Sequence, residues 1–340
     1  MNILWGLLSK WRNELYGISI LWIMLFHLVA EGKIDFKINS ALHNIISHGN
    51  YGVDIFLFLS GISLYFSLQK NSNTIYFYKK RMARLLSPVL IISGTFFVWS
   101  DIYIQGKWIQ FIKNITFYSF WVEGFRGIWF IALIVPLYLI YPFFYRFNNL
   151  KAKSILRFIE VGGFIFFLIV LQQLFPSVYY RIEIALTRIP IFLCGALVAY
   201  KVYLNFRMTK VEKAILFLAL MISVYGIFTP GFFLNSNQNF RFGYFLAGIS
   251  LPWIFILILE FFELDNLNKF FSNIGRISLE LYVIHVSIYA IVFGSAVWKG
   301  IEYKSYASIL LFFICILLGY IYDKIHQNIK KYFKGYIIFK

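Results

Sequence analysis

Two ionisable residues near the start of the chain belong to long apolar segments, where burying a polar or charged group is costly. His27 follows the start of the segment 15–30 by 12 residues, about 18 Å along a helix at 1.5 Å per residue. Such a histidine can act as a general base near neutral pH, or it can bridge two helices through a hydrogen bond. Asp54 opens the next apolar segment, where a carboxylate can orient an imidazole or cap a helix. Because the two segments form a hairpin, we expect Asp54 to approach His27.

A basic run, Lys79-Lys80-Arg81-Met-Ala-Arg84, precedes the third apolar segment. Basic loops are common on the inner side of membrane proteins, so the run also serves as a signal of orientation. Arg81 and Arg84 are three residues apart, however, and therefore share one face of a helix. Two guanidinium groups on one face at a membrane surface suit the binding of phosphate groups.

A third polar group occurs late in the chain, within Ser278-Leu-Glu-Leu-Tyr-Val-Ile-His285. Tyr282 and His285 are three residues apart and share a helix face, with Glu280 closer to the start of the segment. Glu280 is equally compatible with an interfacial carboxylate, and His285 with a hydrogen bond between helices. We treat all three as candidate site residues.

The segments that must position these residues are apolar along the whole chain. Of 340 residues, 60% are hydrophobic and only 14% are charged, and the mean hydropathy is +0.73, whereas soluble domains contain about 25% charged residues. An all-α integral membrane protein with about ten transmembrane helices is therefore predicted, as a single domain over residues 1–340 without a separate soluble part. The expected spans are 15–30, 52–68, 85–104, 127–145, 156–174, 185–200, 214–229, 242–262, 277–298 and 306–322, the fourth interrupted by Pro136 and Pro142.

The distribution of basic residues predicts the orientation of these spans. Of the 32 lysine and arginine residues, 22 fall on the side of the N-terminus and 10 on the other side. The richer side is expected to be cytoplasmic, so both termini should be cytoplasmic. On the opposite side, a polar face is expected from Glu123, Arg126, Arg188 and Arg241.

The remaining composition narrows the possible partners. The lysine and arginine residues that give the net charge of +17 lie between apolar segments. They therefore indicate the orientation of the chain in a membrane, and no nucleic-acid partner is expected. The two cysteines, Cys194 and Cys315, belong to different expected spans, and no cluster of Cys and His occurs at ligand spacing. We therefore expect no metal and no bound cofactor.

Five of these features occur in the order typical of the membrane acyltransferase-3 family, which the chain resembles over residues 12–285. They are the helix Gly17–His27 ending in Phe-His, the segment Gly52-Val-Asp-Ile-Phe-Leu-Phe-Leu-Ser-Gly61, Arg81-Met-Ala-Arg84, the helix from Trp129-Phe-Ile to Tyr141-Pro142, and the segment Ser278–His285. The resemblance implies transfer of an acyl group, usually acetyl from acetyl-CoA, to a hydroxyl of a cell-surface carbohydrate. The expected location is the bacterial cell membrane.

The resemblance also implies roles for individual residues. His27 would be the catalytic histidine, Asp54 a functional carboxylate, and Arg81 and Arg84 determinants for the acyl-CoA donor. Family members commonly carry an arginine where this chain has Tyr16. Arg12 lies one helical turn earlier on the same face and is a candidate replacement.

A mechanism follows from the solubility of the donor. The nucleotide of coenzyme A cannot cross hydrocarbon, so the arginine pair would hold it at the inner face while the pantetheine arm extends between helices towards His27. His27 would then deprotonate the acceptor hydroxyl, or become acylated itself. The acceptor can be a capsule, O-antigen, exopolysaccharide or peptidoglycan. The alternative function is a transporter of lipid-linked sugars or a polysaccharide polymerase, neither of which explains an arginine pair combined with a Phe-His helix end.

Overall fold

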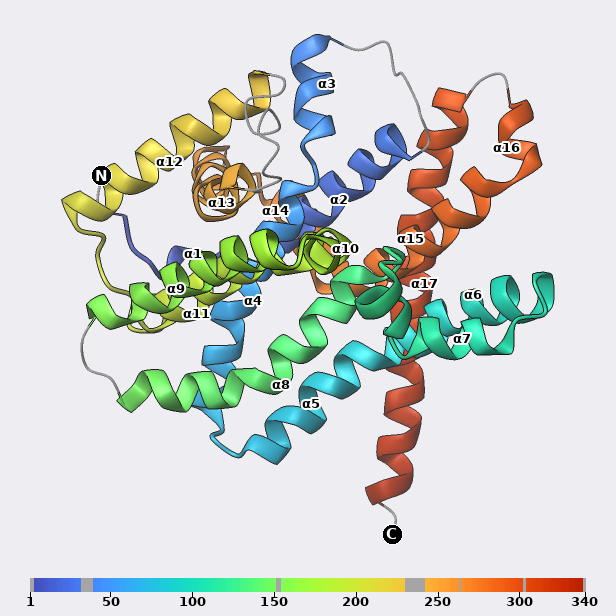
Figure 1. Ribbon diagram of the computed structural model, residues 1–340, viewed down its shortest axis with the longest axis horizontal. Helices are drawn as coiled ribbons and strands as arrows, with labels where there is room; N and C mark the ends of the chain where they lie inside the picture. Colours follow the sequence, from blue (N-terminus) through green and yellow to red (C-terminus); the bar gives the residue numbers. More distant parts are fainter. Residues whose placement is uncertain are drawn as a thin grey trace.

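A computed structural model describes residues 3–31, 39–150, 154–229, 242–262, 264–301 and 304–338, and these form helices joined by short connections (Figure 1). The first half contains α1 (Leu7–Lys10), α2 (Arg12–Ala30), α3 (Ser40–Ser47), α4 (Tyr51–Lys70), α5 (Thr74–Pro88), the π-helix η1 (Val89–Ser93), α6 (Gly94–Phe97), the π-helix η2 (Val98–Ile104), α7 (Trp108–Ile115) and the π-helix η3 (Ser119–Glu123). The second half contains α8 (Trp129–Leu150), α9 (Ser154–Leu174), α10 (Pro176–Leu186), α11 (Ile189–Tyr203), α12 (Lys210–Phe228), α13 (Phe242–Phe262), α14 (Asp265–Arg276), α15 (Ser278–Gly294), α16 (Ala296–Gly300) and α17 (Lys304–Ile338).

Seven helices among the described residues are long and apolar enough to cross a membrane, which indicates a multi-pass membrane protein. They are α2, α4, the continuous stretch Thr74–Ile104, α8, α12, α13 and α17. The pairs α10 with α11 and α14 with α15 also qualify if each bent pair counts as one span, giving up to nine. The sequence predicts ten, and the difference is α9, which provides only the shorter apolar helix Ile159–Leu174.

Several expected boundaries differ from the observed helices. The third apolar segment begins at Thr74, not at 85, so the basic run is part of the same long helix that enters the membrane. Pro136 and Pro142 lie inside α8, which continues through both. The expected span 185–200 is divided by a bend of 41° between α10 and α11.

Close helix crossings at glycine fix the centre of the bundle. A Cβ atom on Gly17 of α2 would lie 2.0 Å from the carbonyl oxygen of Phe271, and one on Gly275 of α14 would lie 1.8 Å from that of Asn13. Any larger residue at either position would therefore separate α2 from α14. Because α14 is held against α2 and α15 follows at an angle of 69°, the crossing brings the segment Ser278–His285 alongside α2.

A second crossing positions α4, whose residues are the most enclosed of the seven long helices. A Cβ atom on Gly195 of α11 would lie 2.0 Å from the carbonyl oxygen of Phe58, and one on Gly61 of α4 would lie 2.4 Å from that of Phe192. The close contact of α4 with α11 leaves another face of α4 directed towards α2 and α8.

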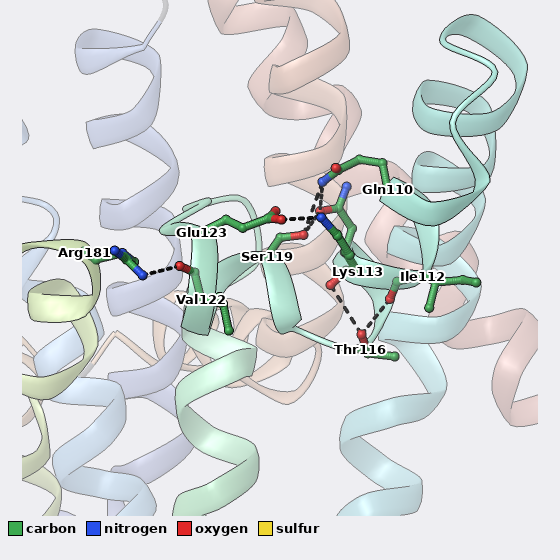
Figure 2. Close-up of polar contacts among 9 residues, drawn as sticks. Gln110, Ile112, Lys113, Thr116, Ser119, Val122, Glu123 and Arg181 are labelled. Atoms are coloured by element: carbon green, nitrogen blue, oxygen red, sulfur yellow. Dashed lines mark hydrogen bonds and ion pairs between the residues drawn. The ribbon is translucent and has the colours of Figure 1, made fainter. Parts of the chain in front are cut away.

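Polar contacts join the ends of the helices on each side of the bundle. At the end of the bundle that contains α1, Lys10 pairs with Glu260 at 3.2 Å and Arg276 pairs with Asp323 at 3.3 Å. At the opposite end, Lys113 pairs with Glu123 at 2.5 Å, and Arg181 donates a hydrogen bond to the carbonyl of Val122 at 2.5 Å (Figure 2). The contact with Glu123 raises the pKa of Lys113. Each contact connects segments that the distribution of basic residues assigns to the same side.

Candidate active site

A central cavity of about 430 Å³ lies between α2, α4, α5, α8 and the junction of α14 with α15. It is lined by Arg12, Asn13, Tyr16, Ile20, Ile23, Val53, Phe56, Ser60, Ser63, Phe66, Ser67, Lys70, Lys80, Arg81, Arg84, Leu85, Phe130, Ile134, Tyr138, Gly275, Ser278, Leu279 and Tyr282. Four of the eight candidate site residues contribute to this lining: Arg12, Arg81, Arg84 and Tyr282. A fifth, His285, contacts the cavity wall through the ring of Tyr282.

One end of the central cavity is strongly cationic. This cationic mouth consists of Arg12 at the start of α2, Lys70 at the end of α4, and Lys80, Arg81 and Arg84 within α5. None of the described residues that line the cavity is acidic. An anion entering the mouth therefore meets five positive charges with no carboxylate of the lining to oppose them.

Arg81 is the more enclosed member of the arginine pair. Its Nη2 donates a hydrogen bond to the carbonyl of Ser63 at 3.0 Å, which holds the side chain against α4. Its Nε is buried without a hydrogen-bond partner among the described residues, so it still has a donor to offer a ligand. Arg84, by contrast, is exposed at the mouth.

Tyr16 lies on the wall of the same cavity as Arg12. Its hydroxyl is 3.4 Å from Oγ of Ser63, and its ring stacks on Phe56 with centroids 5.0 Å apart. Arg12 supplies a cation one helical turn nearer the mouth. The structure thus places both residues where they can contact one ligand.

The cavity extends along most of the length of α4. Along α4 its lining runs from Lys70, the last residue of the helix, to Val53, the third. These residues are separated by 17 positions, about 25 Å at 1.5 Å per residue. The far end is lined by apolar and aromatic side chains, including Ile23, Phe130 and Tyr282.

His27 and His285 meet beyond this far end. Nδ1 of His27 lies 3.0 Å from Nε2 of His285, and the rings stack with centroids 5.2 Å apart. Nδ1 of His285 is 2.8 Å from the carbonyl oxygen of Leu281. His285 is fully buried, whereas His27 is half-buried. His27 is therefore the histidine that a substrate can reach.

Each histidine lies on the cavity-lining face of its helix, one turn beyond the last residue that lines the cavity. On α2 the lining residues Tyr16, Ile20 and Ile23 are followed at the next turn by His27. On α15 the lining residues Ser278 and Tyr282 are followed by His285. Residues three or four positions apart share one helix face, so the two lines of side chains lead from the cavity to the histidine pair.

Asp54 lies on a different face of its helix. The carboxylate accepts a hydrogen bond from Nε of Arg188 at 3.2 Å, and the side chains of both residues are only 2% exposed. The Arg188 guanidinium lies 5.0 Å from the ring centroid of Trp129 and 5.2 Å from that of Tyr244. The sequence leads us to expect Asp54 beside His27; the structure instead pairs it with Arg188 and gives His27 a histidine partner.

Two further acidic residues lie near the site without lining the central cavity. Glu280 is half-buried and lies within electrostatic range of Tyr322 on α17. Glu31 follows His27 by one helical turn and lies within range of the hydroxyls of Tyr282 and Tyr289. Its side chain reaches the surface, yet neighbouring protein atoms displace enough water to raise the pKa of its carboxyl.

Sequence reasoning missed several residues of the cavity wall. Lys70 ends α4, and Ser60, Ser63 and Tyr138 face the middle of the cavity. The signal that could have identified them is their spacing, since Ser60, Ser63 and Lys70 recur on one face of α4. Arg241 lies outside the described residues. Among the described residues, no three of His, Cys, Asp or Glu are grouped as metal ligands.

Comparisons with known proteins add a family and a set of relatives. The family described as acyltransferase domain matches residues 15–322. O-acetyltransferase OatA from Staphylococcus aureus strains NCTC 8325 / PS 47 and COL is 24% identical to the chain over 371 aligned residues, covering 96% of this chain. The chain spans 58% of the length of these relatives. No solved structure matches the chain.

Proposed function

The chain belongs to the acyltransferase domain family, and from this premise we propose that it is a membrane O-acetyltransferase of the bacterial cell envelope. It moves an acetyl group from cytoplasmic acetyl-CoA to a hydroxyl of a cell-surface or lipid-linked polysaccharide. The name of the relative, O-acetyltransferase, supports acetyl as the transferred group. The protein acts as one membrane domain with ten spans and both termini in the cytoplasm, lying in the cytoplasmic membrane.

One observation carries the proposal: the central cavity connects a cationic mouth to the neighbourhood of a paired histidine across the bundle. A donor with a highly charged nucleotide and a thin acylated arm matches this asymmetry. The nucleotide stays at the mouth, because it cannot enter hydrocarbon, and the arm occupies the cavity. The acyl group then reaches the side opposite to the one from which the donor binds.

The cationic mouth supports a donor that carries several phosphates. Arg81 and Arg84 offer guanidinium forks that bind phosphate oxygens in pairs. Arg12, Lys70 and Lys80 add charge from two other segments. Arg12 thus takes the place of the arginine that Tyr16 replaces. We expect Tyr16 to contact the uncharged part of the donor next to Ser63.

The histidine pair supports general base catalysis. A carbonyl oxygen only accepts hydrogen bonds, so His285 carries its proton on Nδ1 towards Leu281 and leaves Nε2 as an acceptor. His27 then donates from Nδ1 and keeps its lone pair on Nε2. The acceptor hydroxyl gives its proton to this Nε2 as its oxygen bonds to the thioester carbon. The carbon–sulfur bond then breaks, and the departing CoA thiolate takes the proton from His27.

The acyl-histidine route uses the same atom. In that route Nε2 of His27 attacks the thioester carbon directly and CoA leaves as the thiolate. In a second step the acceptor oxygen bonds to the acyl carbon, the bond from that carbon to Nε2 breaks, and the acceptor proton passes to the thiolate. The two routes differ in whether labelled acetyl is found on the protein before the acceptor is added.

The experiment that tests the function uses the full chain in lipid nanodiscs with radiolabelled acetyl-CoA and membranes of the producing cell as the source of acceptor. We expect label in polysaccharide that mild alkali releases as acetate, and we expect none with His27→Gln. The competing function, transport or polymerisation of lipid-linked sugars, consumes no acetyl-CoA. Movement or lengthening of lipid-linked sugar with no acetyl-CoA binding would overturn the proposal.

A further inference from the structure

Tyr282 occupies the position between the central cavity and the histidine pair. It lines the cavity, and its ring lies edge-on to Phe130 with centroids 5.3 Å apart. On its other side its ring centroid is 5.7 Å from that of His285, which in turn holds His27. A thioester that reaches the far end of the cavity must therefore lie against Tyr282 before an acceptor can attack it.

The hydroxyl of Tyr282 lacks a hydrogen-bond partner in this position. The side chain is 6% exposed, so water does not solvate the hydroxyl freely. The hydroxyl approaches the backbone of Phe130, but it forms no hydrogen bond of ordinary distance and angle with any described residue. Buried polar groups are nearly always paired, and an unpaired one calls for an explanation such as a catalytic role. A ligand with an acceptor atom at the end of the cavity would supply the missing partner.

We propose that the Tyr282 phenol donates a hydrogen bond to the carbonyl oxygen of the bound thioester and stabilises the oxyanion formed when that carbonyl is attacked. The proposal rests on the function proposed above and adds a catalytic residue to it. A phenol donates one hydrogen bond, and the carbonyl oxygen is the acceptor nearest the reacting carbon of an acyl thioester. Donors directed at such an oxygen in a site that excludes water give large rate enhancements.

The step balances without any further reactant. As the acceptor oxygen bonds to the thioester carbon, the carbonyl electron pair moves to its oxygen and the acceptor proton moves to Nε2 of His27. Tyr282 keeps its proton and shares it with the oxyanion. When the carbonyl re-forms, the carbon–sulfur bond breaks and the thiolate takes the proton from His27. Tyr282 thus contributes electrostatic stabilisation only.

Tyr289 provides a matched comparison within the same helix. Its ring centroid lies 5.4 Å from that of His285, and its hydroxyl is also buried without a hydrogen-bond partner among the described residues. Tyr289 does not line the central cavity. Removing the hydroxyl of Tyr282 or of Tyr289 therefore makes the same chemical change beside the same histidine, but only Tyr282 can contact a ligand in the cavity.

The test is infrared difference spectroscopy of acetyl-CoA carrying carbon-13 at the carbonyl, bound to the His27→Gln protein so that no turnover occurs. A hydrogen bond weakens the carbonyl bond, so we expect the carbonyl band to shift to lower frequency on binding. Adding Tyr282→Phe should return the band towards its position in solution. Adding Tyr289→Phe should leave the shifted band in place.

The outcomes separate this inference from the proposed function. If no bound carbonyl band appears and calorimetry detects no binding of acetyl-CoA, the proposed function fails and the inference fails with it. If acetyl-CoA binds and Tyr282→Phe leaves the shifted band unchanged, the inference alone is overturned. A band that returns equally with Tyr289→Phe would also overturn it, because the effect would then come from repacking around His285.

Kinetics on the chain with His27 intact give a second measure. A donor that acts only on the oxyanion affects the transition state more than the bound substrate, so Tyr282→Phe should lower kcat by about 10²–10³-fold with little change in KM for acetyl-CoA. A rise in KM with unchanged kcat would show that Tyr282 only shapes the cavity.

Discussion

Nε2 of His285 lies 3.0 Å from Nδ1 of His27, and the other nitrogen of His285 is committed to the carbonyl of Leu281 at 2.8 Å. The backbone carbonyl therefore selects the tautomer of His285, and His285 in turn selects the tautomer of His27. The lone pair of His27 is thereby placed on Nε2, on the half-buried side chain of the pair. A carboxylate often fills the orienting role beside a catalytic histidine; here a neutral imidazole fills it, which suits an apolar environment better than a charge.

His27→Gln should abolish acetyl transfer. Glutamine retains hydrogen-bonding capacity but cannot accept a proton at neutral pH, so we expect a loss of about 10²–10⁴-fold in kcat, as for a missing general base. His27→Ala should be equally inactive. The measurement is transfer of labelled acetyl to polysaccharide at equal amounts of membrane protein. A glutamine variant that transfers acetyl at the normal rate would assign His27 to helix bridging, with the base to be sought at His285, His43 or His48.

His285→Leu should lower kcat and leave KM for acetyl-CoA nearly unchanged, because His285 holds the tautomer of His27 and does not line the central cavity. We expect about a tenfold loss, corresponding to one hydrogen bond of about 1–1.5 kcal/mol. His285→Gln should recover part of the rate, since its amide oxygen can accept the proton of His27 Nδ1. Equal rates for leucine and glutamine would show that the hydrogen bond does not contribute to the reaction.

The residue types of the candidate site are easier to predict from the sequence than their contacts. His27, Arg81 and Arg84 are candidates because charged and polar residues stand out in apolar segments and because three-residue spacing defines a helix face. The contact of His27 with His285 could not be predicted, since it depends on the crossing of α2 with α14 at Gly17 and Gly275 and on the bend before α15. Neither the crossing nor the bend has a local sequence signal.

Asp54 shows that a hairpin alone does not determine which residue a side chain pairs with. The cavity face of α4 is marked by Val53, Phe56 and Ser60. Asp54 follows Val53 by one residue, which turns its side chain about 100° away from that face in a helix of 3.6 residues per turn. The hairpin alone does not fix this rotation. Contact with α11 through Gly61 and Gly195 fixes it and directs Asp54 towards Arg188.

Replacing Arg81 and Arg84 together by alanine should weaken binding of acetyl-CoA while the protein still inserts in the membrane. Two charge-assisted contacts are worth about 3–6 kcal/mol, which corresponds to a rise of about 10²–10⁴-fold in Kd. The lower end is expected because Arg84 is exposed and its contacts are screened by solvent. Of the two single variants, Arg81→Ala should weaken the binding of acetyl-CoA more than Arg84→Ala does. Calorimetry in nanodiscs measures the affinity.

Lys79→Ala is the matched control for the arginine pair. Lys79 belongs to the same basic run and is exposed, but it does not line the central cavity. Its removal should leave the affinity for acetyl-CoA close to that of the unchanged protein. A loss of affinity as large as that of the double variant would mean that the run acts through its total charge.

Reporter fusions should place both termini in the cytoplasm. The 22 basic residues on the side of the N-terminus, against 10 on the other, set the expected orientation. Fusions at residues 40 and 115 should report the outside, and fusions at residue 75 and at the C-terminus should report the inside. The fusion at the C-terminus tests the count of ten, since an outside location there would require an odd number of spans.

Asp54→Ala should destabilise the fold more than it alters the chemistry. Asp54 and Arg188 are each 2% exposed, and they join α4 to the start of α11. Removing one partner of a buried ion pair leaves the other charge poorly compensated and costs about 3–5 kcal/mol. We expect a large drop in Tm in detergent. Residual activity per folded molecule at low temperature should stay close to that of the unchanged protein, because Asp54 does not line the central cavity and forms its buried ion pair with Arg188.

The double variant Asp54→Leu with Arg188→Met separates the two roles of the carboxylate. Removing both charges eliminates the uncompensated group, so the Tm should recover relative to Asp54→Ala, and the recovered protein should transfer acetyl. If the Tm recovers but acetyl transfer does not, Asp54 takes part in the reaction, as the sequence suggests. The two variants are informative because the ion pair of Asp54 with Arg188 is buried, so its loss should change Tm by a measurable amount. Asp54 also lies on a face of α4 that does not line the central cavity, so this change in stability can be separated from an effect on the reaction.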